Sequence, residues 1–270
     1  MRPFLALAGA LLASLTLAAC SGGDAVALDP VANAAARTES AGSSRMLMEM
    51  SLGMGGEKFF VNAEGAMDYK RTHGWLLMDF SQLAALTPGA PEMPRLKMLF
   101  ENTTVWMRVP PALMGSTGGK PWARMTLASS SNALGGVQQP DPSQLLDALR
   151  GISGSVKEVG RTRVRGVDTT HYSADVSLEK ALAETPPQQR KAAKAALKLF
   201  GGLEKMPIDL YIDDAGRVRR MEMEYKLQSA GMSFETEVKM ELFDFGTHVA
   251  FKRPPASQVA DFSSLPDAGG

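Results

Sequence analysis

Cysteine, histidine and net charge are all scarce in this chain, and each scarcity argues against a class of function. Cys20 is the only cysteine, so no internal disulfide forms, and with only three histidines no soft-metal cluster is expected. Lys plus Arg and Asp plus Glu both number 29, which gives a formal net charge of zero. No basic excess or polybasic tract indicates a nucleic acid partner. We therefore expect no nucleic acid, no metal and no cofactor.

Long apolar runs are confined to the N-terminus. Arg2 precedes an almost uninterrupted apolar stretch from Pro3 to Ala19, and the stretch closes on Leu-Ala-Ala-Cys at residues 17–20. A secretory signal has this layout, with small residues before the cleavage point. The tetrapeptide resembles the bacterial lipobox, in which the cysteine thiol is acylated and becomes the new N-terminus. The alternative is a transmembrane helix, but about 17 residues is at the short limit for a span.

These features predict a lipid-anchored protein. We expect a signal peptide over residues 1–19, a tether over 20–28 that is lipidated at Cys20, a single domain over 29–262 and a flexible tail over 263–270. The protein would sit on the extracytoplasmic face of a cell membrane, held by its N-terminal lipid. We expect it to be a monomer.

Alternation with a period of two runs through the first half of the chain and predicts strands. Met46, Met48 and Met50 alternate with Leu47 and Glu49. Short strands separated by turn residues favour an antiparallel meander over parallel units. The predicted strands here are 45–52, 59–69, 75–80, 96–100, 104–109 and 122–127.

The second half adds further strands and two helices. A hairpin turn is predicted at Asp213 to Gly216, because glycine suits a positive φ there. Helices are predicted from Asp29 as N-cap to about Ser40, from Asp141 to about 150, and from about Thr185 to 200. Strands are predicted over 156–163, 167–176, 208–213, 220–227 and 232–242, and an irregular tail after Pro255.

The resulting fold class is α+β. We predict one large, strongly curved antiparallel sheet of about ten strands, a half β-barrel, with the helices packed on its concave face. Three modest helices cover such a face incompletely, so either the sheet closes or a ligand shares the space. Methionine is flexible and suits a wall that accepts guests of varied shape. The predicted cavity lining is Met46, Met48, Met50, Phe59, Val61, Met67, Leu210, Met221, Met223, Tyr225, Phe234, Val238 and Met240.

Several segments resemble a known group of proteins. Gly166 to Tyr172, Ile208 to Asp213, Gly216 to Arg220 and Lys120 to Trp122 are similar to segments of actinobacterial lipoproteins of the LppX/LprG type. Those proteins share a fold with the lipoprotein carrier LolA and the sensor domain of RseB. The resemblance implies a LolA-like half-barrel whose cavity binds acyl chains or lipoglycans, and a role in carriage or retention of lipid in the cell envelope.

Other functions are weighed against this one. His73, His171 and His248 lie far apart in the sequence, with no Gly-x-Ser-x-Gly elbow beside them, so we expect no catalytic residue and no enzyme. The second hypothesis is an envelope sensor or protein-docking module of the same fold, with Trp106 and Trp122 as anchors. A third is a structural lipoprotein whose methionine face is only a packed core.

Overall fold

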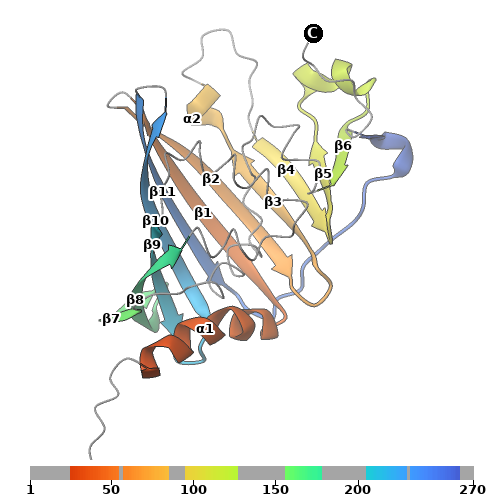
Figure 1. Ribbon diagram of the computed structural model, residues 1–270. Helices are drawn as coiled ribbons and strands as arrows, with labels where there is room; N and C mark the ends of the chain where they lie inside the picture. Colours follow the sequence, from red (N-terminus) through yellow and green to blue (C-terminus); the bar gives the residue numbers. More distant parts are fainter. Residues whose placement is uncertain are drawn as a thin grey trace, which may run out of the picture.

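Twelve strands form one continuous sheet in the computed structural model, which describes residues 25–54, 57–84, 95–126, 156–177, 205–229 and 232–261. The strand order is β12-β6-β5-β4-β3-β2-β1-β11-β10-β9-β8-β7, and the sheet is open, with its two edges well separated (Figure 1). The strands are β1 (Ser43–Met54), β2 (Glu57–Asp68), β3 (His73–Asp79), β4 (Arg95–Glu101), β5 (Thr104–Arg108), β6 (Trp122–Thr126), β7 (Lys157–Val164), β8 (Val167–Ser177), β9 (Lys205–Asp213), β10 (Val218–Ser229), β11 (Met232–Phe243) and β12 (Val259–Asp261). The helices are α1 (Ala25–Ser40), the single turn α2 (Ser81–Ala84), and the 3-10 helices η1 (Pro111–Thr117) and η2 (Ala256–Gln258).

The sheet consists of two antiparallel meanders, β1–β6 and β7–β11, each with its strands in chain order. The meanders join where β1 pairs with β11, in a register that sets Met48 opposite Met240. Consecutive strands lie side by side because short connections favour neighbours. The predicted large antiparallel sheet is confirmed, with twelve strands instead of about ten.

The C-terminal segment differs from its prediction. We expected an irregular tail after Pro255, but η2 and β12 lie there. β12 pairs parallel to β6, with Ala260 opposite Ala123. Three residues carry too little alternation to be recognised as a strand, and this one forms because the chain returns to the open edge of β6.

A strap leads the chain to that edge. We give this name to residues 244–255, which cross one face of the sheet between β11 and β12 (Figure 1). Phe251 stacks on His73, with ring centroids 4.7 Å apart, and also meets Trp106. Arg253 donates a hydrogen bond to the Glu101 carboxylate at 2.5 Å. The strap thereby covers apolar side chains on a face that otherwise carries charge, and Trp106 is buried under it.

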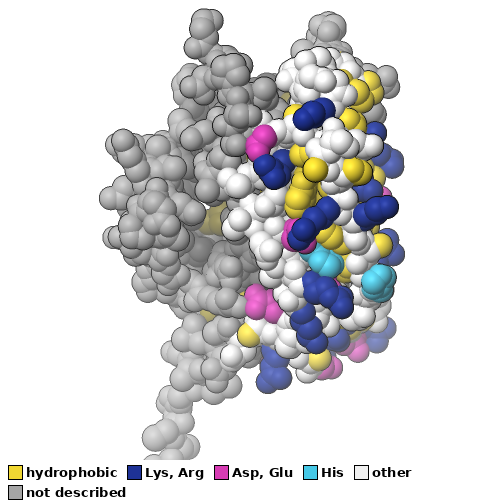
Figure 2. All heavy atoms as spheres, turned by 90° about the vertical axis from the view of Figure 1, so that its right-hand side faces the viewer, with side chains coloured by type: hydrophobic (Ala, Val, Ile, Leu, Met, Phe, Trp, Pro, Cys, Tyr) yellow, Lys and Arg dark blue, Asp and Glu magenta, His cyan; other side chains and the backbone are white. Residues whose placement is uncertain are grey.

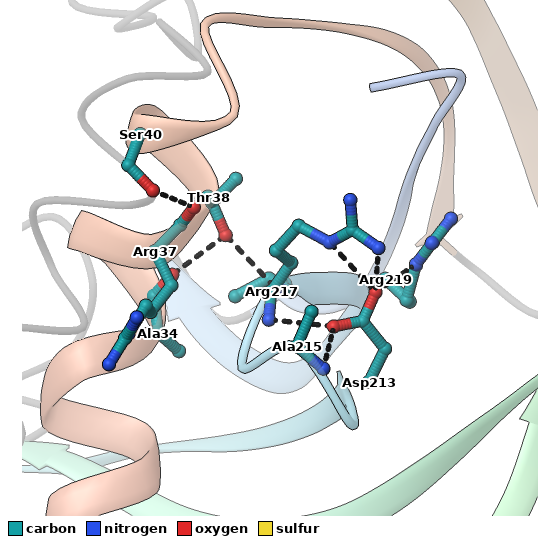
Figure 3. Close-up of polar contacts among 9 residues, drawn as sticks. Ala34, Arg37, Thr38, Ser40, Asp213, Ala215, Arg217 and Arg219 are labelled. Carbon is teal, nitrogen blue, oxygen red and sulfur yellow. Dashed lines mark hydrogen bonds and ion pairs between the residues drawn. The ribbon is translucent and has the colours of Figure 1, made fainter. Parts of the chain in front are cut away.

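Helix α1 packs on the opposite face, across one end of β9 and β10 (Figure 1). Its buried residues Val31, Ala34 and Ala35 belong to the main hydrophobic core. The hydroxyl of Thr38 donates to the Ala34 carbonyl at 2.7 Å and accepts the backbone N–H of Val218 at 2.9 Å. This second bond ties the helix to the β9–β10 hairpin (Figure 3).

The predicted ends of the helices are only partly right. α1 begins at Ala25, one turn before the predicted cap at Asp29. Pro30 removes one intrahelical hydrogen bond, which is tolerated because it lies near the start of the helix. The C-terminal end is as predicted, since Gly42 follows with φ of +86°. The helices predicted from Asp141 and Thr185 lie outside the described residues.

The β9–β10 hairpin turn is confirmed, and one buried carboxylate organises it. Asp213 accepts the backbone N–H groups of Ala215 and Arg217 and the guanidinium groups of Arg217 and Arg219 (Figure 3). Gly216 takes the positive φ, +77°. Burial raises the pKa of Asp213, but these hydrogen bonds outweigh it and hold the pKa below the ordinary value. The Asp213 carboxylate is therefore fully used within the turn and its flanking residues.

Candidate functional site: the inner face of the sheet

We call the face against which α1 packs the inner face. The rows of side chains that run across it are set by the strand register. Met48 lies opposite Ala63 on one side and Met240 on the other, and Met240 lies opposite Met221. The row through Met46 runs from β11 to β6, the row through Met48 from β8 to β4 and the row through Met50 from β8 to β2, and none of the three contains a charged side chain. The inner face is therefore an uninterrupted apolar wall.

Methionine dominates this wall. Nine methionines are buried in the described part of the chain, out of 17 in the sequence. A thioether side chain without branching fits irregular neighbours and repacks at low cost. The wall is thus more deformable than one of valine and isoleucine would be. The buried methionines are Met46, Met48, Met67, Met78, Met98, Met125, Met221, Met223 and Met240.

Burial changes along the strands. Toward the α1 end, in the row through Met46, the side chains of Met46, Leu76 and Met98 are 1–2% exposed. At the end farther from α1, which we call the distal end, apolar side chains pack against the same core but stay partly exposed. The inner face is therefore close-packed beside α1 and less completely covered at the distal end. The partly exposed apolar residues there are Met50, Leu52, Phe59, Phe80, Leu96, Met206 and Tyr225.

Polar groups on the inner face are few and paired. Near α1, the Tyr69 hydroxyl lies 2.6 Å from that of Ser44, and burial raises the pKa of Tyr69 to about 12. At the distal end, Tyr225 lies opposite the buried Thr236. Burial also raises the pKa of Tyr225, although a hydrogen bond with Thr236 partly offsets this. Both tyrosines stay neutral at physiological pH, so the wall gains no charge from them.

The structure places most of the predicted lining residues together on the inner face. Phe59 and Tyr225 are partly exposed there, and Met50 packs against the core. The side chain of Phe234 lies outside the described residues. That these side chains line a cavity stays a prediction. The remaining nine are buried members of one core cluster: Met46, Met48, Val61, Met67, Leu210, Met221, Met223, Val238 and Met240.

Sequence reasoning missed part of the wall on β3. Leu76 and Met78 are buried on the inner face, but they sit in the run Trp75 to Phe80, which is apolar on both faces. The usual polar alternation is absent because Trp75 and Leu77 belong to the face that the strap crosses. The sequence alone therefore does not show which residues of β3 face the inner side and which face the strap.

The opposite face, which we call the outer face, carries the charges. His171 contacts the Asp209 carboxylate through Nε2 at 2.8 Å and stacks on Tyr211 at 4.5 Å. The hydroxyl of Tyr211 donates to Glu222 at 3.0 Å. His73 lies elsewhere, under Phe251 of the strap. These two histidines are held in separate contacts on the outer face.

Both predicted docking anchors, Trp106 and Trp122, also lie on the outer face. Trp106 is only 8% exposed, so the prediction that it anchors a partner is wrong: the strap covers it. Trp122 is half-buried, with the Arg108 guanidinium 5.4 Å from its ring centroid. In the described part of the chain, no helix is long and apolar enough to cross a bilayer, and no group of three metal-ligating side chains is present.

Comparison with known proteins supports the fold. The structure of the lipoprotein LppX from Mycobacterium tuberculosis matches 85% of this chain and 100% of its own, with 11% identity and a TM-score of 0.50. The structure of LprF from Mycobacterium bovis matches 85% of this chain and 97% of its own, with 15% identity and a TM-score of 0.45. The chain therefore has an LppX-type fold, which confirms at the level of fold the resemblance seen in the sequence.

A sequence relative is also found. An uncharacterised 31.2 kDa protein from the rplA–rplJ intergenic region of Streptomyces griseus is 32% identical over 170 residues. The match covers 59% of this chain and 54% of the relative, so the chain spans about half the length of that protein. No family model matches the chain.

Proposed function

We propose that this chain, with its LppX-type fold, is a lipid-anchored extracytoplasmic lipoprotein that binds a hydrophobic ligand on its inner face. The ligand would be an acyl lipid or lipoglycan, and the role would be its carriage or retention in the cell envelope. One observation carries the proposal: the uncharged methionine wall is close-packed beside α1 but incompletely covered at its distal end. A wall of this kind suits a guest that is held by burial alone.

The energetics favour a long apolar guest. Each methylene removed from water contributes about 0.8 kcal/mol, so an acyl chain is held without a specifically placed polar group. The described rows offer only paired polar groups, which have little to gain from a polar ligand. Methionines adjust to chains of different length or branching. The entry point we propose is the distal end, near Met50, Phe59 and Tyr225.

A substitution at the distal end tests the ligand. Met50→Glu places a charge on a side chain that is itself partly exposed but lies between the buried Val61 and Val238. An acyl chain there would meet an unpaired carboxylate, and circular dichroism checks that the variant is folded. We expect loss of most bound lipid, measured by displacement of a fluorescent fatty acid. Leu47→Glu is the matched control, on the same strand but the outer face, and should bind as the parent does. Equal binding by both variants would contradict the proposal.

A second experiment tests the anchor. Cys20→Ser should abolish incorporation of radiolabelled palmitate and release the processed protein from the membrane fraction, or leave it as an unprocessed precursor. Ser21→Ala, at the neighbouring position, should change neither result. Palmitate incorporation by the Cys20→Ser variant would refute lipidation at this residue, without bearing on the ligand of the inner face.

A further inference from the structure

The outer face near the β6 edge has a different charge from the rest of the sheet. The segments that form this part of the sheet, 73–79, 95–126 and 244–261, contain seven Lys and Arg but four acidic residues. By contrast, residues 157–177, 205–229 and 232–243, which hold β7–β11, contain ten basic and eleven acidic residues. A chain with no net charge therefore concentrates positive charge on one side.

Three of the seven cations are paired, but the pairs leave the cation outermost. Arg95 pairs with Asp79, Arg124 with Asp261 and Arg253 with Glu101. In each pair the arginine side chain is more exposed than the carboxylate, with 66% for Arg253 against 17% for Glu101 as the widest difference. The carboxylates are thus partly hidden beneath the guanidinium groups, and the surface presents positive charge.

The other four cations have no carboxylate partner among the described contacts. Lys97, Arg108, Lys120 and Lys252 are all exposed, and Lys120 donates only to the Val259 carbonyl, at 3.1 Å. Strand alternation places Lys97 and Arg108 on the outer face, and Lys252 lies on the strap next to Phe251. These charges are available to an external anion.

Apolar side chains lie between the cations. Figure 2, which views this side of the molecule, shows Lys and Arg gathered around a band of hydrophobic side chains, with few acidic groups. Trp122 and Leu77 are half-buried here, and Leu113 of η1 is 43% exposed. Tryptophan among exposed cations is typical of surfaces that rest in a lipid headgroup layer. The indole suits that layer because it combines an apolar ring with a polar N–H group.

We infer that this basic outer face, formed by β3–β6, β12 and the strap, docks onto an anionic phospholipid surface. The cations stand on long side chains from several elements, at irregular spacing. A fluid layer of phosphate headgroups meets such charges at any spacing, whereas a folded protein partner would need acidic groups at matching positions. The inference concerns the outer face and does not depend on what the inner face binds.

Vesicle capture tests this docking. The full chain is first incorporated through its N-terminal segment into phosphatidylcholine vesicles and checked by co-flotation. Fluorescent vesicles are then added, made either of phosphatidylcholine or of equal parts phosphatidylcholine and phosphatidylglycerol. We expect capture of the anionic vesicles only, weakening as salt is raised. Equal capture of neutral vesicles, or capture of neither kind, would overturn the inference.

Variants locate the contact. Each basic residue at an anionic surface contributes a factor of about five, so Lys97→Glu with Lys252→Glu should raise the half-maximal vesicle concentration at least about thirtyfold. Lys157→Glu with Lys205→Glu makes the same change in net charge on β7 and β9 and should have little effect. If the two double variants weaken capture equally, the net charge of the whole protein is responsible and not this face, and the inference fails. Lys97→Gln with Lys252→Gln, which adds no new charge, should give a smaller loss in the same direction and guards against misfolding.

Discussion

The two faces of this sheet follow opposite rules. The inner face has uncharged rows of methionine and aliphatic side chains and derives its stability from burial, whereas the outer face is a mesh of ion pairs at the water boundary. Neighbouring residues on one strand therefore differ strongly in solvent exposure, because they point to opposite faces: Met48 is 3% exposed and Leu47 is 38% exposed. Substitutions on the two faces should therefore change the stability by different amounts. The following variants compare these losses.

The largest difference is expected between Met48 and Leu47. Met48→Asp would bury an unpaired carboxylate in the core, and we expect it to lower the free energy of unfolding by more than about 3 kcal/mol. Leu47→Asp, one residue away on the outer face, lies between Glu64 and Glu241 and should cost less than about 1 kcal/mol through repulsion. Urea denaturation of both variants measures the difference. Similar losses would mean that the faces are not distinct.

The second prediction concerns the one nearly inaccessible carboxylate at the hairpin. Asp213→Asn leaves the Arg217 and Arg219 guanidinium groups without their anion and should cost about 2–3 kcal/mol at neutral pH. Because folding lowers the pKa of Asp213, its contribution is present above the unfolded carboxyl pKa of about 3.9 and is lost as pH falls through the folded value. The parent and variant stabilities should therefore converge in acid.

Asp214→Asn is the control for this effect. Its carboxylate is exposed and pairs only with the exposed Arg161. We expect an unchanged denaturation midpoint at every pH, because an exposed pair contributes little. A pH-independent loss at Asp213, or a comparable loss at Asp214, would refute the role assigned to the buried carboxylate.

A smaller effect is expected where two backbones approach on the inner face. A Cβ added at Gly65 would lie 2.6 Å from the Trp75 carbonyl oxygen, so Gly65→Ala must push β2 and β3 apart. We expect a loss of about 1–3 kcal/mol. Gly53→Ala faces the outer side, where the nearest atom is the Cβ of Glu235 at 3.3 Å, and should be nearly neutral. Thermal unfolding of the two variants compares them, and a neutral Gly65→Ala would mean that this approach is looser than described.

The smallest effect belongs to the exposed ion pairs. Lys58 and Glu237 lie 2.6 Å apart with nearly half of each side chain exposed. Solvent and salt screen such a pair, so Lys58→Ala should leave the midpoint of denaturation within experimental error at physiological salt. A clear loss of stability would show that the outer mesh contributes as a network and would narrow the contrast between the faces.

Local alternation was enough to predict most of the strands. Met46 to Glu49 and Glu237 to Leu242 alternate between apolar and polar residues, apart from Leu47, and their burial alternates in step. Toward the end of β1 the burial pattern reverses, because Ser51 is buried and Leu52 is partly exposed. Alternation failed on β3, where both faces are apolar, because the strap that covers one of them is remote in sequence: Phe251 lies 178 residues after His73. β12 was missed for a similar reason, since its partner strand is remote.

The candidate site was predicted in composition but not in arrangement. The sequence pattern identified a methionine-rich face, and the structure confirms that most of these methionines belong to one hydrophobic core. The pattern did not reveal that coverage decreases away from α1, because that depends on where the helix packs and on Thr38 joining Val218. Nor did the zero net charge of the whole chain disclose the basic outer face, which arises when β4–β6 and the strap are brought together.

Native mass spectrometry of the purified mature protein, made in a related bacterium and followed by lipid extraction, would show whether the inner face holds a lipid. We expect a stoichiometric adduct that survives gentle ionisation and extracts as an acyl lipid. An apo mass that stays unchanged after incubation with envelope lipids would contradict the proposed ligand binding. The inner face would then be a packed core, and the protein a docking module or structural lipoprotein.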